Sequence, residues 1–116
     1  MTAADCLFCK IASKTLPAKV VYEDDLLIAI EDINPAAPVH ILIIPKEHIS
    51  SLNELQVNHA ALLGQIQLLA ARLASQLNIA EPGYRLVNNC GEMGGQTVMH
   101  LHYHLLGGRN FGWPPG

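Results

Sequence analysis

The sequence predicts an α+β domain built on a mostly antiparallel five-stranded sheet, with one long helix and one short N-terminal helix. Three observations support this fold class. Apolar runs of strand length are separated by short turns, and a single longer segment repeats its apolar residues at helical spacing. The chain has 116 residues, half of them apolar, which suits one domain spanning residues 1–116.

The first half of the chain predicts the short helix and three strands. A helical pattern covers residues 7–13 and ends before Pro17, because proline disfavours helix at the residue that precedes it. Residues 20–22 and 26–30 flank an acidic turn and predict a hairpin. The β-branched run at 39–44 has the composition of a central strand.

The second half predicts the long helix and two further strands. Apolar residues recur at steps of three and four, the period of one helix face, at Leu62, Ile66, Leu69, Leu73 and Leu77. This stripe favours packing on the sheet over binding of a partner, and residues 81–83 end the pattern with Pro82 and Gly83. Residues 84–88 and 98–106 then predict strands on either side of a glycine-rich loop.

Charge and cysteine content exclude several classes of protein. The chain has 7 basic and 10 acidic residues and a formal net charge of −3, with no basic cluster that would follow a nucleic acid backbone. No apolar run is long enough to cross a bilayer, and the N-terminus does not resemble a secretory signal. Three cysteines without an export signal predict reduced thiols and a cytoplasmic location.

Three alternating histidines dominate the predicted last strand. Alternate residues of a strand share a face and lie about 6.6 Å apart, so His100, His102 and His104 are expected on one small surface. Imidazole titrates near neutral pH and can act there as nucleophile, acid or base. Three histidines could also bind zinc with an open fourth position, as in hydrolytic zinc enzymes. The pattern alone leaves both kinds of site open.

The glycine-rich loop before these histidines favours a phosphate site. Gly91, Gly94 and Gly95 allow backbone N–H groups to approach an anion, and Gln96 and Thr97 add side-chain donors. The loop ends three residues before His100, so a phosphate held there would lie beside the histidines. This placement favours phosphate chemistry over a catalytic zinc ion.

The alternation at residues 100–106, His-Leu-His-Tyr-His-Leu-Leu, resembles the signature of the histidine triad (HIT) family. The resemblance covers nearly the whole chain, through the segments at residues 6–11, 16–18, 22–25, 32–35, 44–46 and 94–98. Residues 106–109 and 113–116, Leu-Gly-Gly-Arg and Trp-Pro-Pro-Gly, resemble the Hint branch in particular. A HIT-like fold and a homodimer are what this resemblance implies.

The resemblance also implies an activity, namely hydrolysis of the P–N bond of purine nucleoside phosphoramidates. His102 would attack phosphorus, forming a nucleotidyl-histidine that water hydrolyses to a nucleoside monophosphate of the AMP or GMP type, with no cofactor required. His100 would orient His102 through its other ring nitrogen, His104 would contact the phosphate, and His40 matches a further histidine near the triad. The alternatives are a nucleotide-binding regulatory module with incidental turnover, a dinucleoside polyphosphate hydrolase and a nucleotidyltransferase.

Nucleotide contacts follow from the same resemblance. Asp32 matches a residue that binds the ribose hydroxyls, and Ile33 with its neighbour Asn34 matches the wall against the base. Asn89 matches a contact to the sugar and phosphate. Phosphate contacts are expected from the loop and the triad, at Gly95, Gln96, Thr97, His102 and His104.

Cys6 and Cys9 form a CxxC pair near the N-terminus, and two more ligands would complete a structural zinc site. The resemblance to bacterial-type members of the family supplies them as His48 and His100. The alternative is a pair of reduced cysteines packed as small apolar residues.

Overall fold

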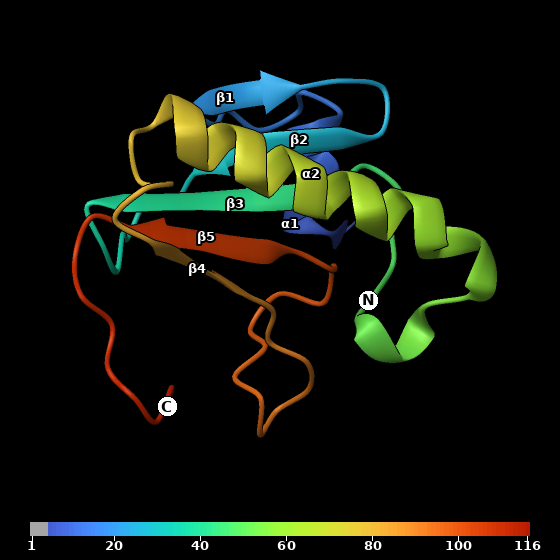
Figure 1. Cartoon of the computed structure of the whole chain (residues 1–116). Coiled ribbons are helices and arrows are strands. Elements are labelled where there is room, and N and C mark those ends of the chain that lie inside the picture. The colour runs from blue at the N-terminus through green and yellow to red at the C-terminus, as the bar shows by residue number, and fades with distance from the viewer. Residues whose placement is uncertain (1–4) are drawn as a thin grey trace.

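A computed structural model describes residues 5–116 and confirms the predicted fold class. Five antiparallel strands form one sheet in the order β1-β2-β3-β5-β4 (Figure 1). The strands are β1 (Val20–Glu23), β2 (Leu27–Glu31), β3 (Val39–Pro45), β4 (Tyr84–Val87) and β5 (Tyr103–Gly107). The helices are α1 (Leu7–Ala12) and α2 (Ala60–Gln76), with two short 3₁₀ turns, η2 (Leu52–Glu54) and η3 (Val57–His59).

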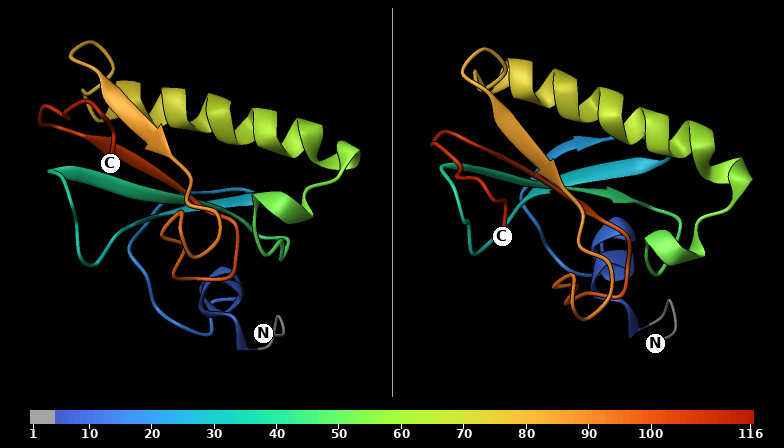
Figure 2. Two further views of the ribbon diagram at one scale, coloured as in Figure 1. Left: turned by 90° about the horizontal axis from the view of Figure 1, so that it is seen from below. Right: turned by 60° about the horizontal axis from the view of Figure 1, so that its bottom comes forward.

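The sheet divides the core into two apolar clusters, because successive residues of a strand face opposite sides. Figure 2 shows α2 along one face of the sheet, with α1 and the loop that follows β4 on the other. The α2 side buries Leu27, Ala29, Ile41, Ile43 and Leu105 of the sheet. The α1 side buries Ile28, Ile30, Leu42 and Ile44 together with Cys6, Phe8 and Ile11. The two faces of the sheet therefore carry separate apolar clusters.

Helix α2 packs on the sheet through the predicted apolar stripe. Ile66, Leu69 and Leu73 are at most 3% exposed. The helix ends earlier than predicted, because Leu77 caps it and Asn78 turns the chain with a left-handed φ of 62°. Leu77 therefore lies outside the helix and is partly exposed. Within residues 5–116, no helix is long and apolar enough to cross a membrane.

The prediction of one strand over residues 98–106 is wrong, because β5 begins only at Tyr103. Residues 98–102 leave the sheet, and the backbone N–H of Leu101 donates to the Ile49 carbonyl at 2.6 Å while its side chain is buried. His104 lies in β5, whereas His100 and His102 lie in the segment before it. The three histidines therefore do not share one strand face.

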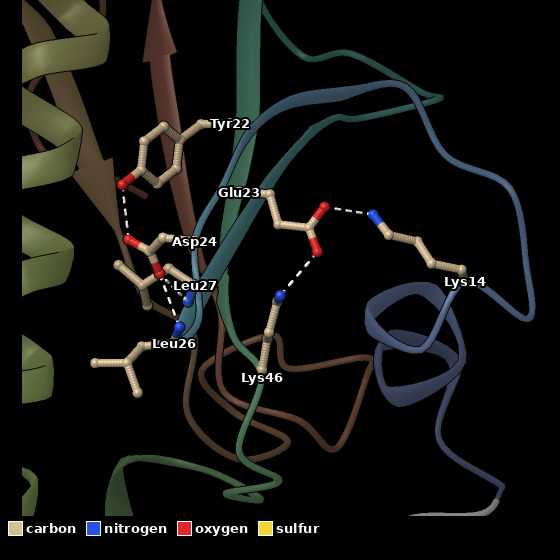
Figure 3. A network of polar contacts seen from close by, with 7 residues as sticks. All are labelled: Lys14, Tyr22, Glu23, Asp24, Leu26, Leu27 and Lys46. Atoms are coloured by element: carbon tan, nitrogen blue, oxygen red, sulfur yellow. Dashed lines mark hydrogen bonds and ion pairs between the residues drawn. The ribbon is translucent and has the colours of Figure 1, made fainter.

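The turn between β1 and β2 is fixed by Asp24 (Figure 3). Its carboxylate accepts the backbone N–H groups of Leu26 and Leu27, each at 2.8 Å, and the Tyr22 hydroxyl at 2.7 Å. Beside it, Glu23 accepts from Lys14, just after α1, and from Lys46, just after β3, at 2.7 Å for Lys46.

The hydrogen bonds from these two ammonium groups lower the pKa of the Glu23 carboxyl. This carboxylate thus joins the α1 segment to two strands.

Candidate active site

The His102 ring is held in one tautomer by the backbone. Its Nδ1–H donates to the carbonyl of His100 at 2.7 Å, so the lone pair is on Nε2. The ring is 6% exposed, and Phe8 packs edge-on against it with ring centroids 4.9 Å apart. Burial lowers the pKa of His102 and keeps the imidazole neutral. The result is a neutral ring with its lone pair on Nε2, held in place by a hydrogen bond to the main-chain carbonyl of His100.

His104 lies beside His102, with ring centroids 5.1 Å apart, and is connected to His40. The backbone N–H of Ala36 donates to His40 Nδ1 at 2.9 Å, so the His40 proton is on Nε2. This Nε2–H donates to His104 Nδ1 at 2.9 Å, which leaves the His104 proton on its own Nε2. One backbone amide thus sets the tautomer of two histidines and makes His104 a donor.

Electrostatics keep His104 neutral. Burial, then the proximity of His102 and His40, lowers its pKa to about 4. Near pH 7 a neutral ring with a proton on Nε2 can donate a hydrogen bond to a phosphate oxygen.

Asp32 lies between the histidines and a pocket of about 610 Å³ on the α1 side of the sheet. Its Oδ1 accepts the N–H of Asn34 at 2.7 Å, and its Oδ2 is 3.4 Å from His40 Nε2. The pocket size suits a drug-sized ligand such as a nucleoside. Ile33, 92% exposed, and Asn34 also line it. Most of its wall is apolar, formed by Leu7, Phe8, Ile11, Leu16, Pro17, Ala18, Ile30, Leu42 and Val98.

The glycine-rich loop has a compact conformation that needs its glycines. Gly91 and Gly95 have positive φ angles of 75° and 83°, and a Cβ at Gly94 would lie 2.2 Å from the Cys90 carbonyl oxygen. Asn89 donates to the Gly94 carbonyl at 2.7 Å and stabilises the same turn.

The Gln96 side chain is hydrogen-bonded to backbone groups of the protein through both its amide nitrogen and its oxygen. Its amide donates to the carbonyls of Ser50 at 2.8 Å and Val98 at 3.0 Å, and its oxygen accepts the Gly91 N–H at 2.9 Å. Thr97 differs, since no hydrogen bond within residues 5–116 engages its exposed hydroxyl or its N–H. Thr97 therefore has both a hydroxyl and a backbone N–H available to a ligand.

Cys6, Cys9, His48 and His100 come together on the α1 side, and their ligand atoms all lie within 4.8 Å of one another. His100 Nδ1 is 3.2 Å from both Cys6 Sγ and His48 Nδ1, and 3.5 Å from Cys9 Sγ. Cys9 Sγ is 3.2 Å from His48 Nδ1. A tetrahedral zinc ion with ordinary bond lengths separates two nitrogens by about 3.3 Å and sulfur from nitrogen by about 3.6 Å. The four side chains therefore fit a zinc ion closely.

The surroundings of this cluster also suit a metal. His100 Nε2–H donates to the Pro45 carbonyl at 2.8 Å, which leaves the Nδ1 lone pair facing the two sulfurs. The Cys9 N–H donates to Cys6 Sγ at 3.4 Å, a contact that stabilises a thiolate. Burial and the neighbouring Cys6 raise the pKa of Cys9 to about 11, so without a cation the thiol keeps its proton. The His100 ring thus belongs to the cysteine cluster.

The HIT domain profile matches residues 13–111 of this chain. The chain belongs to the HIT family. An uncharacterized HIT-like protein of Synechococcus elongatus is 54% identical over 112 residues, which cover 97% of this chain and 97% of that protein. The purine nucleoside phosphoramidase of Escherichia coli K12 is 47% identical over 110 residues, covering 95% of this chain and 92% of the relative. The crystal structure of a HIT family hydrolase from Legionella pneumophila Philadelphia 1 matches with a TM-score of 0.95 at 51% identity, covering 97% of this chain and 100% of the other.

A second group of potential ligands in this HIT protein, formed by Asp32, His40 and His104, is less suited to a metal. His40 accepts a hydrogen bond at Nδ1, so the Nε2 that faces the group holds a proton in the neutral ring. The three histidine rings also do not point to one place, since the His100 ring faces the cysteines. This geometry argues against the zinc-hydrolase alternative, in which all three triad rings bind one ion.

Sequence reasoning missed two contacts of the HIT site. Asn88 donates to the His102 carbonyl at 2.9 Å, and its Oδ1 is buried without a partner among residues 5–116. Phe8 packs edge-on against both His100 and His102. An asparagine at a strand end and a phenylalanine in a helix give no sign of either contact in the sequence.

The depressed pKa of His104 predicts a pH-dependent stability for this HIT protein. The pKa of His104 is about 6.5 in the unfolded chain, whereas in the folded protein it is lowered to about 4. Between these values the unfolded state binds more protons, so the free energy of unfolding should fall as the pH falls. For this partly buried ring we expect a contribution on the order of 2 kcal/mol between about pH 7 and about pH 4.5.

Urea denaturation of the wild type and of His104→Gln at several pH values measures this contribution. The variant should lose less stability over the same interval, and an equal loss in both proteins would show that His104 is not responsible.

Proposed function

We propose that this HIT protein hydrolyses purine nucleoside phosphoramidates through a covalent intermediate on His102. The observation that supports this most directly is the hydrogen bond from His102 Nδ1–H to the His100 carbonyl, which leaves a neutral Nε2 free to attack. The 47% identity to a protein named purine nucleoside phosphoramidase supports the same substrate class.

Two displacements make up the proposed reaction. His102 Nε2 donates its lone pair to the α-phosphorus and forms a P–N bond to the ring. The original P–N bond breaks, and the amine leaves with that electron pair and takes a proton from solvent. Water then attacks the phosphorus and loses a proton to solvent, the P–N bond to His102 breaks with its electron pair returning to Nε2, and the nucleoside monophosphate is released from the neutral imidazole. The His104 Nε2–H donates to a phosphate oxygen and stabilises the charge that develops there.

We assign the nucleotide contacts to the residues around the pocket. Asp32 accepts the ribose hydroxyls through its partly buried carboxylate, and the base lies against the apolar wall with Ile33 and Asn34 at its edge. Thr97 supplies hydroxyl and N–H donors to the phosphate. Gly95, Gln96 and Asn89 act by holding the loop in the shape that presents Thr97.

Release of AMP from adenosine phosphoramidate tests the proposal, with the guanosine compound alongside to compare purines. We expect steady turnover of both substrates, and turnover that persists in excess chelator at a temperature where the protein stays folded. Tight binding of AMP without turnover would favour a regulatory module. A strong preference for diadenosine polyphosphates would favour the polyphosphate hydrolase alternative.

We also propose that Cys6, Cys9, His48 and His100 hold a structural zinc ion. The donor set and the interatomic distances support it, and no open coordination position remains for a substrate. When bound, the ion would cross-link the N-terminal segment to the segments that follow β3 and precede β5. The catalytic step proposed for His102 does not use it.

The active form proposed here is a homodimer. β4 lies at one edge of the sheet, where its outer backbone groups can pair with a second copy, and Leu68 on α2 is 73% exposed. A cytoplasmic location and a purine preference remain predictions from the sequence.

A further inference from the structure

Arg109 follows β5 and contacts the loop between β2 and β3. Its Nε donates to the Ala36 carbonyl at 3.1 Å, its Nη1 donates to the Asn110 carbonyl at 3.0 Å, and its guanidinium lies 4.3 Å from the centre of the Phe111 ring. Within residues 5–116 no carboxylate forms an ion pair with it. The arginine is therefore engaged with backbone and with an aromatic ring, and not with an acid.

Ala36 connects Arg109 to His40 through its two backbone groups. Its carbonyl accepts from Arg109, and its N–H donates to His40 Nδ1 at 2.9 Å. Gly108 also lies close to this loop, because a Cβ added to Gly108 would lie 2.8 Å from the Pro38 Cβ. Gly108 has a positive φ of 92°, so this approach needs a glycine. The segment after β5 therefore contacts residues 36–38 at two points, through Arg109 and through Gly108.

We propose that Arg109 is a positioning residue that fixes the tautomers of His40 and His104 through Ala36. The chain of contacts runs from Arg109 to the Ala36 carbonyl, from the Ala36 N–H to His40, and from His40 Nε2–H to His104 Nδ1. With Ala36 held, His104 presents an N–H to the phosphate.

If Ala36 moves, His40 can place its proton on Nδ1 and accept at Nε2 instead. His104 would then donate from Nδ1 and turn a lone pair toward the phosphate oxygen, which weakens its contact.

Arg85 provides a matched control in the same region. It donates to the Gly112 carbonyl and lies 5.4 Å from the centre of the same Phe111 ring, so it also anchors the C-terminal segment. It makes no contact with Ala36. Arg85→Gln and Arg109→Gln therefore both remove one arginine from the Phe111 ring, but only the second releases Ala36.

Two readouts test the inference on the whole 116-residue chain. Long-range ¹H–¹⁵N NMR reports which nitrogen of His40 and His104 holds the proton, and the phosphoramidate assay reports kcat and KM. In the wild type and Arg85→Gln we expect the proton on Nε2 of both rings. In Arg109→Gln we expect a mixture of tautomers, and a kcat lower by about tenfold with KM changed less than about twofold.

Wild-type tautomers in Arg109→Gln, or an equal change in both variants, would overturn the inference. The kinetic part rests on the proposed function, whereas the NMR part does not, so an inactive wild type would refute the function and still leave the role of Arg109 measurable. If Arg109→Gln unfolds, Arg109→Lys tests the same point, because it keeps the charge and removes the Nε donor.

Discussion

Replacing His102 with alanine is expected to slow the release of AMP from adenosine phosphoramidate by about a thousandfold or more. The reason is that the proposed covalent intermediate needs Nε2, and the two neighbouring triad rings are committed elsewhere. His100 Nδ1 faces the cysteine cluster and its Nε2–H is bound to the Pro45 carbonyl. His104 accepts from His40 and presents a proton. Neither can replace the missing nucleophile.

Single-turnover release of AMP measures this effect, with Met99→Ala as the control. Met99 lies in the same segment, three residues before His102, and its side chain is 38% exposed. The control should keep its rate, and urea denaturation should show that both variants are folded. A His102→Ala protein that retains more than about a tenth of the wild-type rate would rule out the covalent route.

Replacing Cys6, one of the four proposed zinc ligands, is expected to abolish metal binding and to destabilise the fold. Cys6 is fully buried, caps α1 through its sulfur, and lies 3.2 Å from His100 Nδ1. A tightly held ion adds to the free energy of unfolding by mass action, on the order of 4 kcal/mol when the ion is about a thousandfold above its Kd. For a domain of this size that corresponds to a fall in Tm of about 15 °C.

Elemental analysis and thermal melts of the wild type, Cys6→Ser and Cys90→Ser check this prediction. Cys90 is a free cysteine outside the cluster, so its variant should keep one zinc per chain and a near-native Tm. Adding chelator to the wild type should reproduce the melt of Cys6→Ser, which separates loss of the ion from damage by the substitution. A wild-type protein purified with zinc far below one per chain would refute the site.

The fold could be predicted from local patterns because both the strand signal and the helix signal are strong in this chain. The run at residues 39–44 and the stripe on α2 are short-range signals, and the structure places both as expected, except that Leu77 lies just past the end of α2. The last strand was extended too far because alternating His and Leu imitate a strand. The true course is set by the contact of Leu101 with Ile49 and by the His100 ring turning to the cysteines. Both contacts join segments distant in the chain, which no local pattern records.

The site was partly predictable for the same reason. The CxxC spacing is readable locally, but His48 and His100 could be assigned only through resemblance to a family. The side-chain amide of Gln96 donates to the Ser50 carbonyl, 46 residues away, and no local pattern records such a contact. No local pattern indicated a positioning role for Arg109, since its contact with Ala36 forms only when β3 and β5 pair.

The division of the core by the sheet has a practical consequence for changing this protein. The apolar cluster under α2 contacts the strands from the side opposite the nucleotide pocket, the histidines and the cysteine cluster. We therefore expect that substitutions which repack the α2 cluster can raise the thermal stability without touching the residues of the pocket or of the cysteine cluster. A more stable α2 cluster would in turn offset the destabilising effect of substitutions in the loops on the other face, which are the positions to vary when selecting for a new leaving group.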